Sequence, residues 1–408
     1  MKGKQLGQLQ NILSGNKLRM KHKILTLTLL NFAALILTGC SVSGVFINDE
    51  IKFATADTNK QNEVAASIYL IGDVGDPSAD KQEPSLASLQ KDASENSVPE
   101  KMIFFLGDNI YDFGMQAEDD ADRKEMERRI DEQMKVILES NSKGYFIPGN
   151  HDWDYWGKDG ANAVKRQEKY VEEKSDGKIS FLPDNACPGP EIIDVQDDLR
   201  IILFDSQWIL QDYRYRSADG CSSKSEDEVY KNIEAAFKSA GNRKVLVLAH
   251  HPVDSHGEHG GFFSWEAHLF PLRAFVKELW IPFPVIGSLY PLARNLGITS
   301  QDMSSSVYKR MANRLDSIYT KYSPVAVAAG HDHSMQVLQM NNYLMLVSGG
   351  GLAARIRSLT TGKNTIFAYD DSGYMRIDLL KNGRMKLDVI IPVNDGKESE
   401  DVFSIWLN

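Results

Sequence analysis

From residue 67 onward, short apolar runs of strand length alternate with longer segments in which apolar residues recur every three or four positions. Many of the runs stop near a glycine or a polar residue, as buried strands do where they reach the edge of a sheet. This pattern predicts strands at 67–71, 101–106, 199–204, 244–248, 325–329, 343–347, 374–380 and 385–393.

Two of the intervening segments have the apolar spacing of amphipathic helices. Met126, Ile130, Met134 and Ile137 repeat at helical spacing, and a second repeat of this kind covers 307–318. Strands and helices alternate first, and strands then crowd together near the C-terminus. Such an order predicts an α/β fold with mixed sheets.

The first forty residues follow a different pattern. Basic residues gather at 17–23, a mostly apolar run follows at 24–37, and the tetrapeptide Leu-Thr-Gly-Cys occupies 37–40. This order is typical of a signal peptide over 1–39, and the apolar run is short for a membrane span. A plain secretory signal and a single membrane anchor are the alternatives. Met20 opens a segment that is a complete signal by itself, so it is a candidate start of translation.

The tetrapeptide resembles the lipobox of bacterial lipoproteins, in which the cysteine is acylated. This resemblance implies that Cys40 carries lipid and becomes the first residue of the mature, exported protein. We therefore expect a lipid anchor in a bacterial membrane, at the outer membrane or the periplasmic face. The expected parts that follow are a lipidated cysteine and tether at 40–66, one domain at 67–395 with an insert at 260–305, and a C-terminal tail at 396–408.

The charge balance of the chain is acidic, with 46 Lys and Arg against 56 Asp and Glu. Residues 1–39 contain six basic and no acidic residues, so the remainder has 40 basic against 56 acidic residues and a net charge of −16. Such a surface does not attract nucleic acid, and we expect no nucleic-acid partner. A phosphate-binding site would need local positive charge, for which metal ions are the obvious source.

Only two cysteines, Cys187 and Cys221, follow Cys40. In an exported chain this pair favours a disulfide, which would stabilise the fold by closing a loop. Two free, buried thiols are the alternative.

Polar motifs occur where four of the predicted strands end, and a fifth follows the short run Tyr145-Phe146-Ile147-Pro148. Each motif alone is weak, because Gly-Asp and Gly-Asn pairs usually make turns. Together they predict one ligand site, since α/β sheets bind ligands at the carboxyl ends of their strands. The motifs are Gly72-Asp73-Val74-Gly75, Gly107-Asp108-Asn109-Ile110-Tyr111, Gly149-Asn150-His151-Asp152, Val247-Leu248-Ala249-His250 and Gly330-His331-Asp332-His333.

The residue types in these motifs favour a metal site. Carboxylate, amide oxygen and imidazole suit iron, manganese and zinc, whereas an all-thiolate site would need cysteines that the chain lacks. Two metal ions about 3.5–4 Å apart clamp a phosphate group and generate hydroxide at neutral pH. The motifs therefore predict a dinuclear site that acts on phosphate.

The ordered motifs resemble those of the calcineurin-like metallophosphoesterases and, within them, the purple acid phosphatases. The resemblance covers about 67 to 351 and implies a four-layer αββα sandwich of two mixed sheets. It also implies Fe³⁺ beside a divalent ion, which is Fe²⁺, Zn²⁺ or Mn²⁺. His151 and His259 match histidines that contact phosphate and help to protonate the leaving group. The residues that match the ligands are Asp73, Tyr111 and His333 for iron, Asn150, His250 and His331 for the divalent ion, and Asp108 as the bridge.

The activity that this resemblance implies is hydrolysis of small phosphate esters, phosphomonoesters foremost, by a metal-bound hydroxide. A nucleotidase or phosphodiesterase of the same superfamily is the alternative, although most of those members lack a tyrosine equivalent to Tyr111. A lipoprotein that uses the scaffold only to bind a partner is the non-enzyme alternative. A metalloprotease is disfavoured because the sequence contains no His-Glu-x-x-His motif.

Two departures from the family pattern matter. His251 directly follows His250, where close relatives have a tyrosine, so the choice of ligand between them rests on the Val-x-x-His count. The segment 260–305 is long, rich in aromatic residues and interrupted by prolines that exclude one long helix. We expect a lid or a membrane-facing insert beside the site, and additional core is the alternative.

Overall fold

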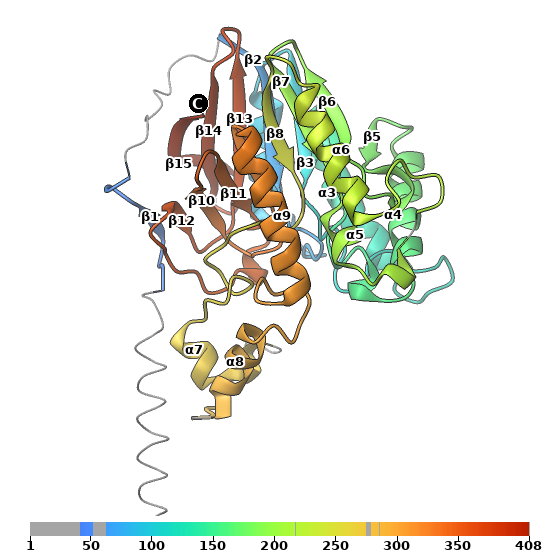
Figure 1. Cartoon of the computed structure of the whole chain (residues 1–408). Coiled ribbons are helices and arrows are strands. Elements are labelled where there is room, and N and C mark those ends of the chain that lie inside the picture. The colour runs from blue at the N-terminus through green and yellow to red at the C-terminus, as the bar shows by residue number, and fades with distance from the viewer. Residues whose placement is uncertain (1–40, 52–62, 217, 275–278, 285, 408) are drawn as a thin grey trace, which may run out of the picture.

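The computed structural model describes residues 41–51, 63–216, 218–274, 279–284 and 286–407, so the expected signal peptide and Cys40 lie outside the described residues. Two sheets pack face to face, and helices cover their outer faces (Figure 1). This is the α/β sandwich of two mixed sheets that the sequence predicts. Within the described residues, no helix is both long enough and apolar enough to cross a bilayer.

The first sheet has the strand order β15–β14–β13–β2–β3–β4–β5. Its parallel strands are β2 (Val64–Ile71), β3 (Glu100–Phe105), β4 (Lys143–Phe146) and β5 (Ile179–Phe181). Its antiparallel strands are β13 (Tyr374–Leu380), β14 (Met385–Val393) and β15 (Glu398–Leu407).

The second sheet has the strand order β1–β12–β10–β11–β9–β8–β7–β6. Its parallel run joins β7 (Leu199–Leu203), β8 (Lys244–Leu248), β9 (Ala326–Ala329) and β11 (Leu344–Ser348). Its antiparallel strands are β1 (Val45–Ile47), β6 (Glu191–Val195), β10 (Met335–Gln339) and β12 (Thr365–Tyr369).

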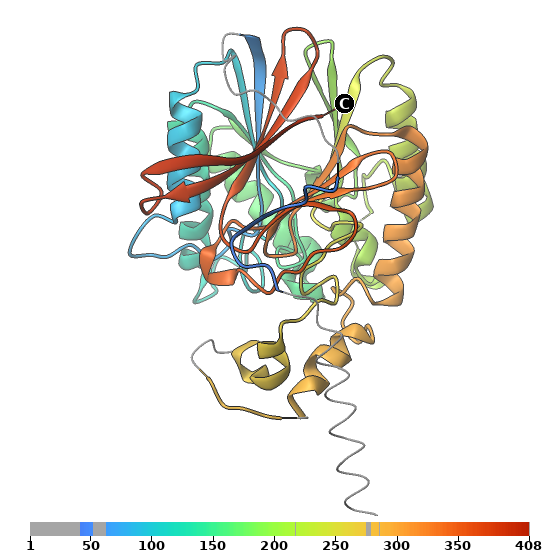
Figure 2. The ribbon, with the colours of Figure 1, turned by 90° about the vertical axis from the view of Figure 1, so that its left-hand side faces the viewer.

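The helices fall into three groups. Beside the first sheet are α2 (Pro84–Glu95), α3 (Arg123–Glu139) and α4 (Gly160–Lys174). Beside the second are α5 (Ser206–Leu210), α6 (Glu226–Lys238) and α9 (Ser306–Tyr322). The short α7 (Trp265–Leu269) and α8 (Leu289–Asn295) lie in the expected insert and stand clear of both sheets at one end of the molecule (Figure 2). Single 3₁₀ turns occupy Asp154–Trp156, Asp184–Ala186, Tyr213–Tyr215, Pro271–Ala274, Ile286–Ser288 and Ala353–Arg355.

Side-chain alternation along the strands creates the layers. In β2, Ile68 and Leu70 enter the apolar core between the sheets, whereas Tyr69 and Ile71 enter the core beneath the helices. The other central strands alternate in the same way. Because both faces are buried, these strands read as continuous apolar runs, which is why the sequence predicts them well.

Two expected boundaries are wrong. The residues 396–408 are not a tail, because β15 pairs with β14 and buries Phe403, Ile405 and Leu407. The apolar run at 402–407, interrupted only by Ser404, is the strand signal that the sequence interpretation overlooked. The stretch 40–66 is not wholly a tether either, because β1 pairs with β12 and β2 already begins at Val64.

A disulfide joins Cys187 to Cys221 across a sequence separation of 34 residues. It ties the loop after β5 to the loop before α6. A bridge of this length restricts the unfolded chain, which is the main way in which disulfides stabilise proteins.

Candidate metal centre

The polar motifs converge because the parallel strands of both sheets end at the same place. Asp73 follows β2, Asp108 follows β3 and Asn150 follows β4, whereas His250 follows β8 and His331 follows β9. Three of these residues have left-handed backbone, with φ of 63° at Asp73, 54° at Asp108 and 69° at His331. Such conformations cost free energy outside glycine and persist only where the surroundings impose them, often at functional sites.

The first group of candidate ligands is Asp73, Tyr111 and His333. The Tyr111 hydroxyl donates to Asp73 Oδ1 at 3.3 Å and lies 3.1 Å from His333 Nε2. His333 Nε2 is 3.5 Å from Asp73 Oδ1. All three side chains are buried, so the structure brings together the residues that the sequence assigns to iron.

The second group is Asn150, His250 and His331. Asn150 Oδ1 lies 3.0 Å from His250 Nε2 and 2.9 Å from His331 Nδ1. Asp108 adjoins both groups: its Oδ1 is 3.3 Å from His250 Nε2, and it shares a potential metal cluster with Asp73 and His333. This is where a bridging carboxylate would have to lie.

Hydrogen bonds to backbone carbonyls indicate which ring nitrogens carry protons. His250 Nδ1 bonds Leu106 O at 2.8 Å, His333 Nδ1 bonds Arg355 O at 2.9 Å, and His331 Nε2 bonds Gln301 O at 2.9 Å. A carbonyl only accepts, so each of these nitrogens donates. In a neutral imidazole the other nitrogen then presents a lone pair to the centre.

This arrangement fits a cation. Lone pairs of His250 and His331 face the carbonyl oxygen of Asn150, which is also an acceptor, and a metal ion between them would satisfy all three. Burial lowers the pKa of His331 well below its ordinary value, which keeps its ring neutral. Burial and the Asp108 carboxylate raise the pKa of Asp73 well above its ordinary range, and a cation bound between the two acidic groups would offset both effects.

Glycines in the motifs allow the ligand loops to approach closely. A Cβ at Gly149 would run into Asp108 Oδ1 and the backbone nitrogen of Asp108. A Cβ at Gly330 would run into Asp73 Oδ2. These motifs therefore need glycine because the neighbouring loop and its carboxylate pass directly over the backbone.

Two further histidines, His151 and His259, border the centre. His151 Nδ1 donates to Asp112 O at 2.7 Å, and its Nε2 lies 3.9 Å from Asp108 Oδ2. The ring of His259 lies 4.1 Å from that of His331, between centroids. Both rings are thus close to the centre without belonging to either group of ligands.

The structure distinguishes His250 from His251. His250 Nε2 faces Asn150 and Asp108, whereas His251 Nδ1 lies 2.8 Å from Ser206 Oγ. The position of His250 agrees with the Val-x-x-His count. His251 still stands close, since its ring is 4.4 Å from that of His331 and the three histidines form a potential metal cluster.

Sequence reasoning missed the residues that support the centre. Asp152 is buried and accepts hydrogen bonds from the backbone nitrogens of Gly149, Asn109 and Ile110, so it ties two ligand loops together. Its place in the Gly-Asn-His-Asp motif is the signal that could have revealed it. Arg355 covers the Tyr111 ring at 3.6 Å from its centroid, and no sequence signal singles it out.

Arg294 is another supporting residue that the sequence does not reveal. This buried guanidinium pairs with Asp302 and lies 3.0 Å from His259 Nδ1. Asp302 Oδ1 is also 3.3 Å from His259 Nδ1, which would favour a proton there. Arginine is a permanent donor and the ring is neutral, so we place a lone pair on Nδ1 and the proton on Nε2. Burial and Arg294 lower the pKa of His259 well below its ordinary value, in agreement with a neutral ring.

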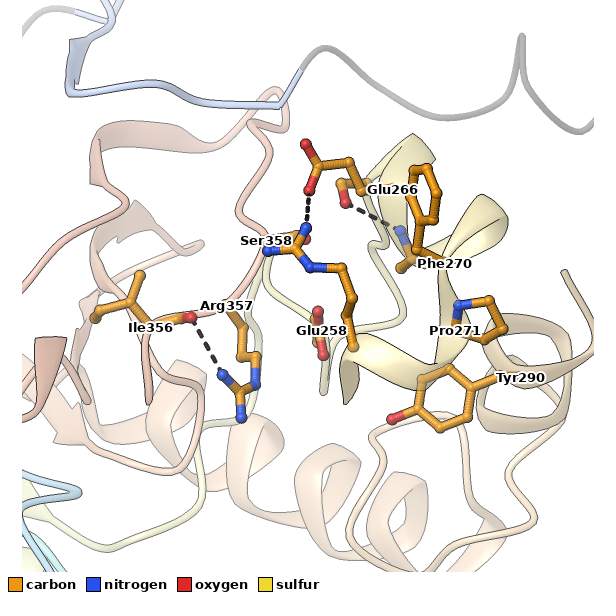
Figure 3. A pocket seen from close by; sticks show the side chains of 11 residues that line it. Glu258, Glu266, Phe270, Pro271, Tyr290, Ile356, Arg357 and Ser358 are labelled. Carbon is orange, nitrogen blue, oxygen red and sulfur yellow. Dashed lines mark hydrogen bonds and ion pairs between the residues drawn. The ribbon is translucent and has the colours of Figure 1, made fainter. Parts of the chain in front are cut away.

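A cavity of about 180 Å³ adjoins the centre, between the insert and the segment 356–358 (Figure 3). Glu258, Phe270, Tyr290 and Arg357 are among the residues that line it. The backbone nitrogen of Arg357 donates to the carbonyl oxygen of His333 at 3.3 Å, so the cavity and the centre share a wall. Burial and the charge of Arg357 lower the pKa of His333 to about 4.

Residues 66–335 match the family model described as calcineurin-like phosphoesterase. The match covers well over half of the chain, which therefore belongs to this family. The family uses a dinuclear metal centre, and the clusters of buried Asp and His residues agree with metal binding. No curated protein sequence matches the chain.

Solved structures with related folds include three that are similar over most of this chain. GAP50, the anchor in the inner membrane complex of Plasmodium, is 16% identical with a TM-score of 0.54, over 84% of this chain and 88% of that chain. The purple acid phosphatase PPD1 from yellow lupin (Lupinus luteus) seeds is 14% identical with a TM-score of 0.49, over 84% and 53%. PhoD is 10% identical with a TM-score of 0.48, over 83% and 68%. The likeness to GAP50 concerns the fold alone.

Proposed function

We propose that this protein hydrolyses phosphate esters, and phosphomonoesters in preference to diesters, at a site that holds two metal ions. The observation that carries the proposal is the convergence of lone pairs around Asp108. The groups Asp73, Tyr111 and His333 on one side and Asn150, His250 and His331 on the other are the residues that would hold the ions. We propose Fe³⁺ for the first group, because a phenol suits a trivalent ion, and a divalent ion for the second.

Metal ions bound here would polarise the phosphoryl oxygens and lower the pKa of a water molecule. The protein itself supplies positive charge beside the centre through Arg355 and Arg357. An acidic protein that binds a phosphate dianion needs such local charge. Arg355 pairs with Asp76 and Asp112 at 3.3 Å, which fixes its guanidinium over Tyr111.

The two bordering histidines differ in the atom that carries a proton. His151 donates from Nδ1 to Asp112 O, so its Nε2 presents a lone pair near Asp108 and accepts a proton. His259 accepts from Arg294 at Nδ1, so its Nε2 carries the proton and donates a hydrogen bond. We propose that His259 donates a hydrogen bond from Nε2 to the phosphate or to the leaving-group oxygen. We propose that His151 accepts a hydrogen bond at Nε2 from a protonated oxygen of the bound phosphate.

The test is an assay of purified protein, stripped of metal and then reloaded with iron, zinc or manganese, against p-nitrophenyl phosphate and bis(p-nitrophenyl) phosphate. Reloading should restore monoester hydrolysis, and His250→Ala should abolish both turnover and stoichiometric metal content. His256→Ala is the matched control, because this buried histidine contacts Asn364 rather than the centre and should leave turnover unchanged.

Three results would contradict the proposal or redirect it. Faster diester than monoester hydrolysis would assign the chain to the phosphodiesterases of the superfamily. Metal binding without hydrolysis of either ester would favour the alternative hypothesis that the protein is a binding module on this scaffold and not an enzyme. Full activity of His250→Ala would remove the second metal group from the mechanism.

The cellular location is a separate proposal. We propose that the protein is exported and anchored to a bacterial membrane through lipid on Cys40, with a small phosphorylated molecule as substrate. The support is the sequence at 37–40 and the acidic charge of the remaining chain, which disfavours a nucleic-acid partner.

A further inference from the structure

The insert exposes an unusual number of apolar side chains. Ten of the seventeen exposed large apolar residues among the described residues lie between 262 and 298. Exposed apolar residues scattered singly over a surface are ordinary, but a concentration of them marks an interaction site. They are Phe262, Trp265, Leu279, Trp280, Ile281, Ile286, Leu289, Leu292, Leu296 and Ile298.

The helix α8 presents its apolar face outward. Leu289, Leu292 and Leu296 are 60%, 52% and 70% exposed, and their spacing of three and four residues places them on one side of the helix. The opposite side buries Pro291 and Arg294. The polarity is thus the reverse of an ordinary surface helix, whose charged side faces water.

The part of this surface formed by 279–300 carries almost no charge, whereas α7 and the turn after it add the ion pair between Glu266 and Arg273. Arg294 is the only charged residue between 279 and 300 in a chain of strongly acidic composition, and it is buried. The exposed surface of this stretch is therefore formed by uncharged side chains. Two exposed tryptophans, Trp265 and Trp280, belong to the same surface, and tryptophan favours the interface between lipid and water.

The first residues that the structure describes, Ser41 and Val42, lie beside this surface. Ser41 Oγ donates to Leu359 O at 3.4 Å, and the backbone nitrogen of Val42 donates to the same oxygen at 2.8 Å. Leu359 forms a bridge with Gly257, whose carbonyl accepts from the backbone nitrogen of Phe262 at 3.0 Å. The residues that follow Cys40 are therefore held at the base of the insert, and α7 and α8 project beyond the sheets from there (Figures 1 and 2).

We propose that the outer face of the insert, formed by the ten exposed apolar residues named above, docks onto a lipid bilayer surface. Forty residues that include the apolar run at 24–37 precede the point at which the chain enters. A bilayer reached by that segment, or by lipid on Cys40, would therefore lie beside this face. A second copy of the chain is the competing occupant, but it would not account for the entry point.

Docking would also bring the metal centre close to the membrane. Gln301 O accepts from His331 Nε2 at 2.9 Å, and Met303 N donates to His259 O at 2.9 Å. The C-terminal end of the insert thus contacts the centre directly. Substrates would reach the site from the region next to the lipid headgroups.

The test uses the intrinsic fluorescence of the full-length protein bound to vesicles of phosphatidylethanolamine and phosphatidylglycerol, with and without bromine on the acyl chains. Bromine quenches only tryptophans that enter the bilayer, so the readout does not depend on what attaches the protein to the vesicle. The bound protein should lose emission on brominated lipid, and this loss should disappear in the double variant Trp265→Phe with Trp280→Phe.

The matched variants change three exposed apolar residues each. Leu289→Ser with Leu292→Ser and Leu296→Ser should reduce the quenching, whereas Leu138→Ser with Ile192→Ser and Tyr213→Ser, outside the insert, should leave it unchanged. Thermal unfolding checks that both variants fold, and the measurement on the wild-type protein stands without them. Equal emission of bound wild-type protein on both lipids would overturn the proposal. So would a dimer in solution that the leucine variant dissociates, because the second copy would then be the occupant.

Discussion

Replacing Tyr111 with phenylalanine removes one hydroxyl from the candidate centre and keeps the ring beneath Arg355. That hydroxyl lies between Asp73 Oδ1 and His333 Nε2, at 3.3 and 3.1 Å. Burial and the carboxylates of Asp73 and Asp108 raise the pKa of Tyr111 well above its ordinary value. Without a bound cation the phenol therefore keeps its proton throughout the neutral pH range.

The free energy needed to ionise the phenol determines how strongly the affinity for iron depends on pH. Even an ordinary phenol, with a pKa of about 10, costs about 4 kcal/mol to ionise at pH 7. If Tyr111 binds Fe³⁺, this proton leaves on binding, so the logarithm of the affinity rises with pH by one additional unit per pH unit. Tyr111→Phe should lower that slope by one and remove the visible absorption of a tyrosinate bound to iron.

The assay is titration of metal-free protein with ferric citrate, with proton release measured at several pH values between about 6 and 8, below the ordinary phenol pKa. The wild-type protein should release one proton more than Tyr111→Phe. Tyr308→Phe is the matched control, because this buried hydroxyl donates to Pro252 O at 2.7 Å and should not change proton release. Equal proton release by wild type and Tyr111→Phe, or a colourless iron-loaded wild type, would refute the assignment of Tyr111 as a ligand.

Three further predictions concern stability, the support of His259 and anchoring. Reducing the Cys187–Cys221 bridge, which spans 34 residues, should lower the free energy of unfolding by about 3.8 kcal/mol and the melting temperature by about 5 °C. Calorimetry of the reduced and the oxidised protein measures both changes, and an unchanged melting temperature would contradict the estimate from chain entropy. Arg294→Gln removes a positive charge that lowers the pKa of His259, so this pKa should rise, as measured by NMR titration of the ring, while kcat falls by no more than the roughly 10²–10⁴-fold typical of a general acid; an unchanged pKa would exclude the link. Cys40→Ser should release the protein from membranes, and unchanged membrane fractionation would disprove the lipid anchor.

The central strands and the motif order follow from the sequence because both are local signals. β2, β3, β8 and β13 are buried on both faces, so their apolar runs are visible without knowledge of their neighbours. Four of the five ligand motifs follow such a strand, namely β2, β3, β8 or β9, and parallel strands that end at one edge bring all five motifs together. The family, the fold and the candidate ligands could therefore be predicted.

Only the tertiary structure decides which side chains support or surround these motifs. The contact of Arg294 with His259 and the position of Arg355 over Tyr111 join residues that are distant in the sequence and that no periodicity links. The pairing of β15 with β14 and the outward apolar face of α8 have the same origin. An apolar pattern in the sequence indicates that side chains are more stable away from water. Only the packed chain shows whether other residues of the protein bury them. The protein buries the apolar side chains of β15, whereas it leaves the apolar face of α8 exposed.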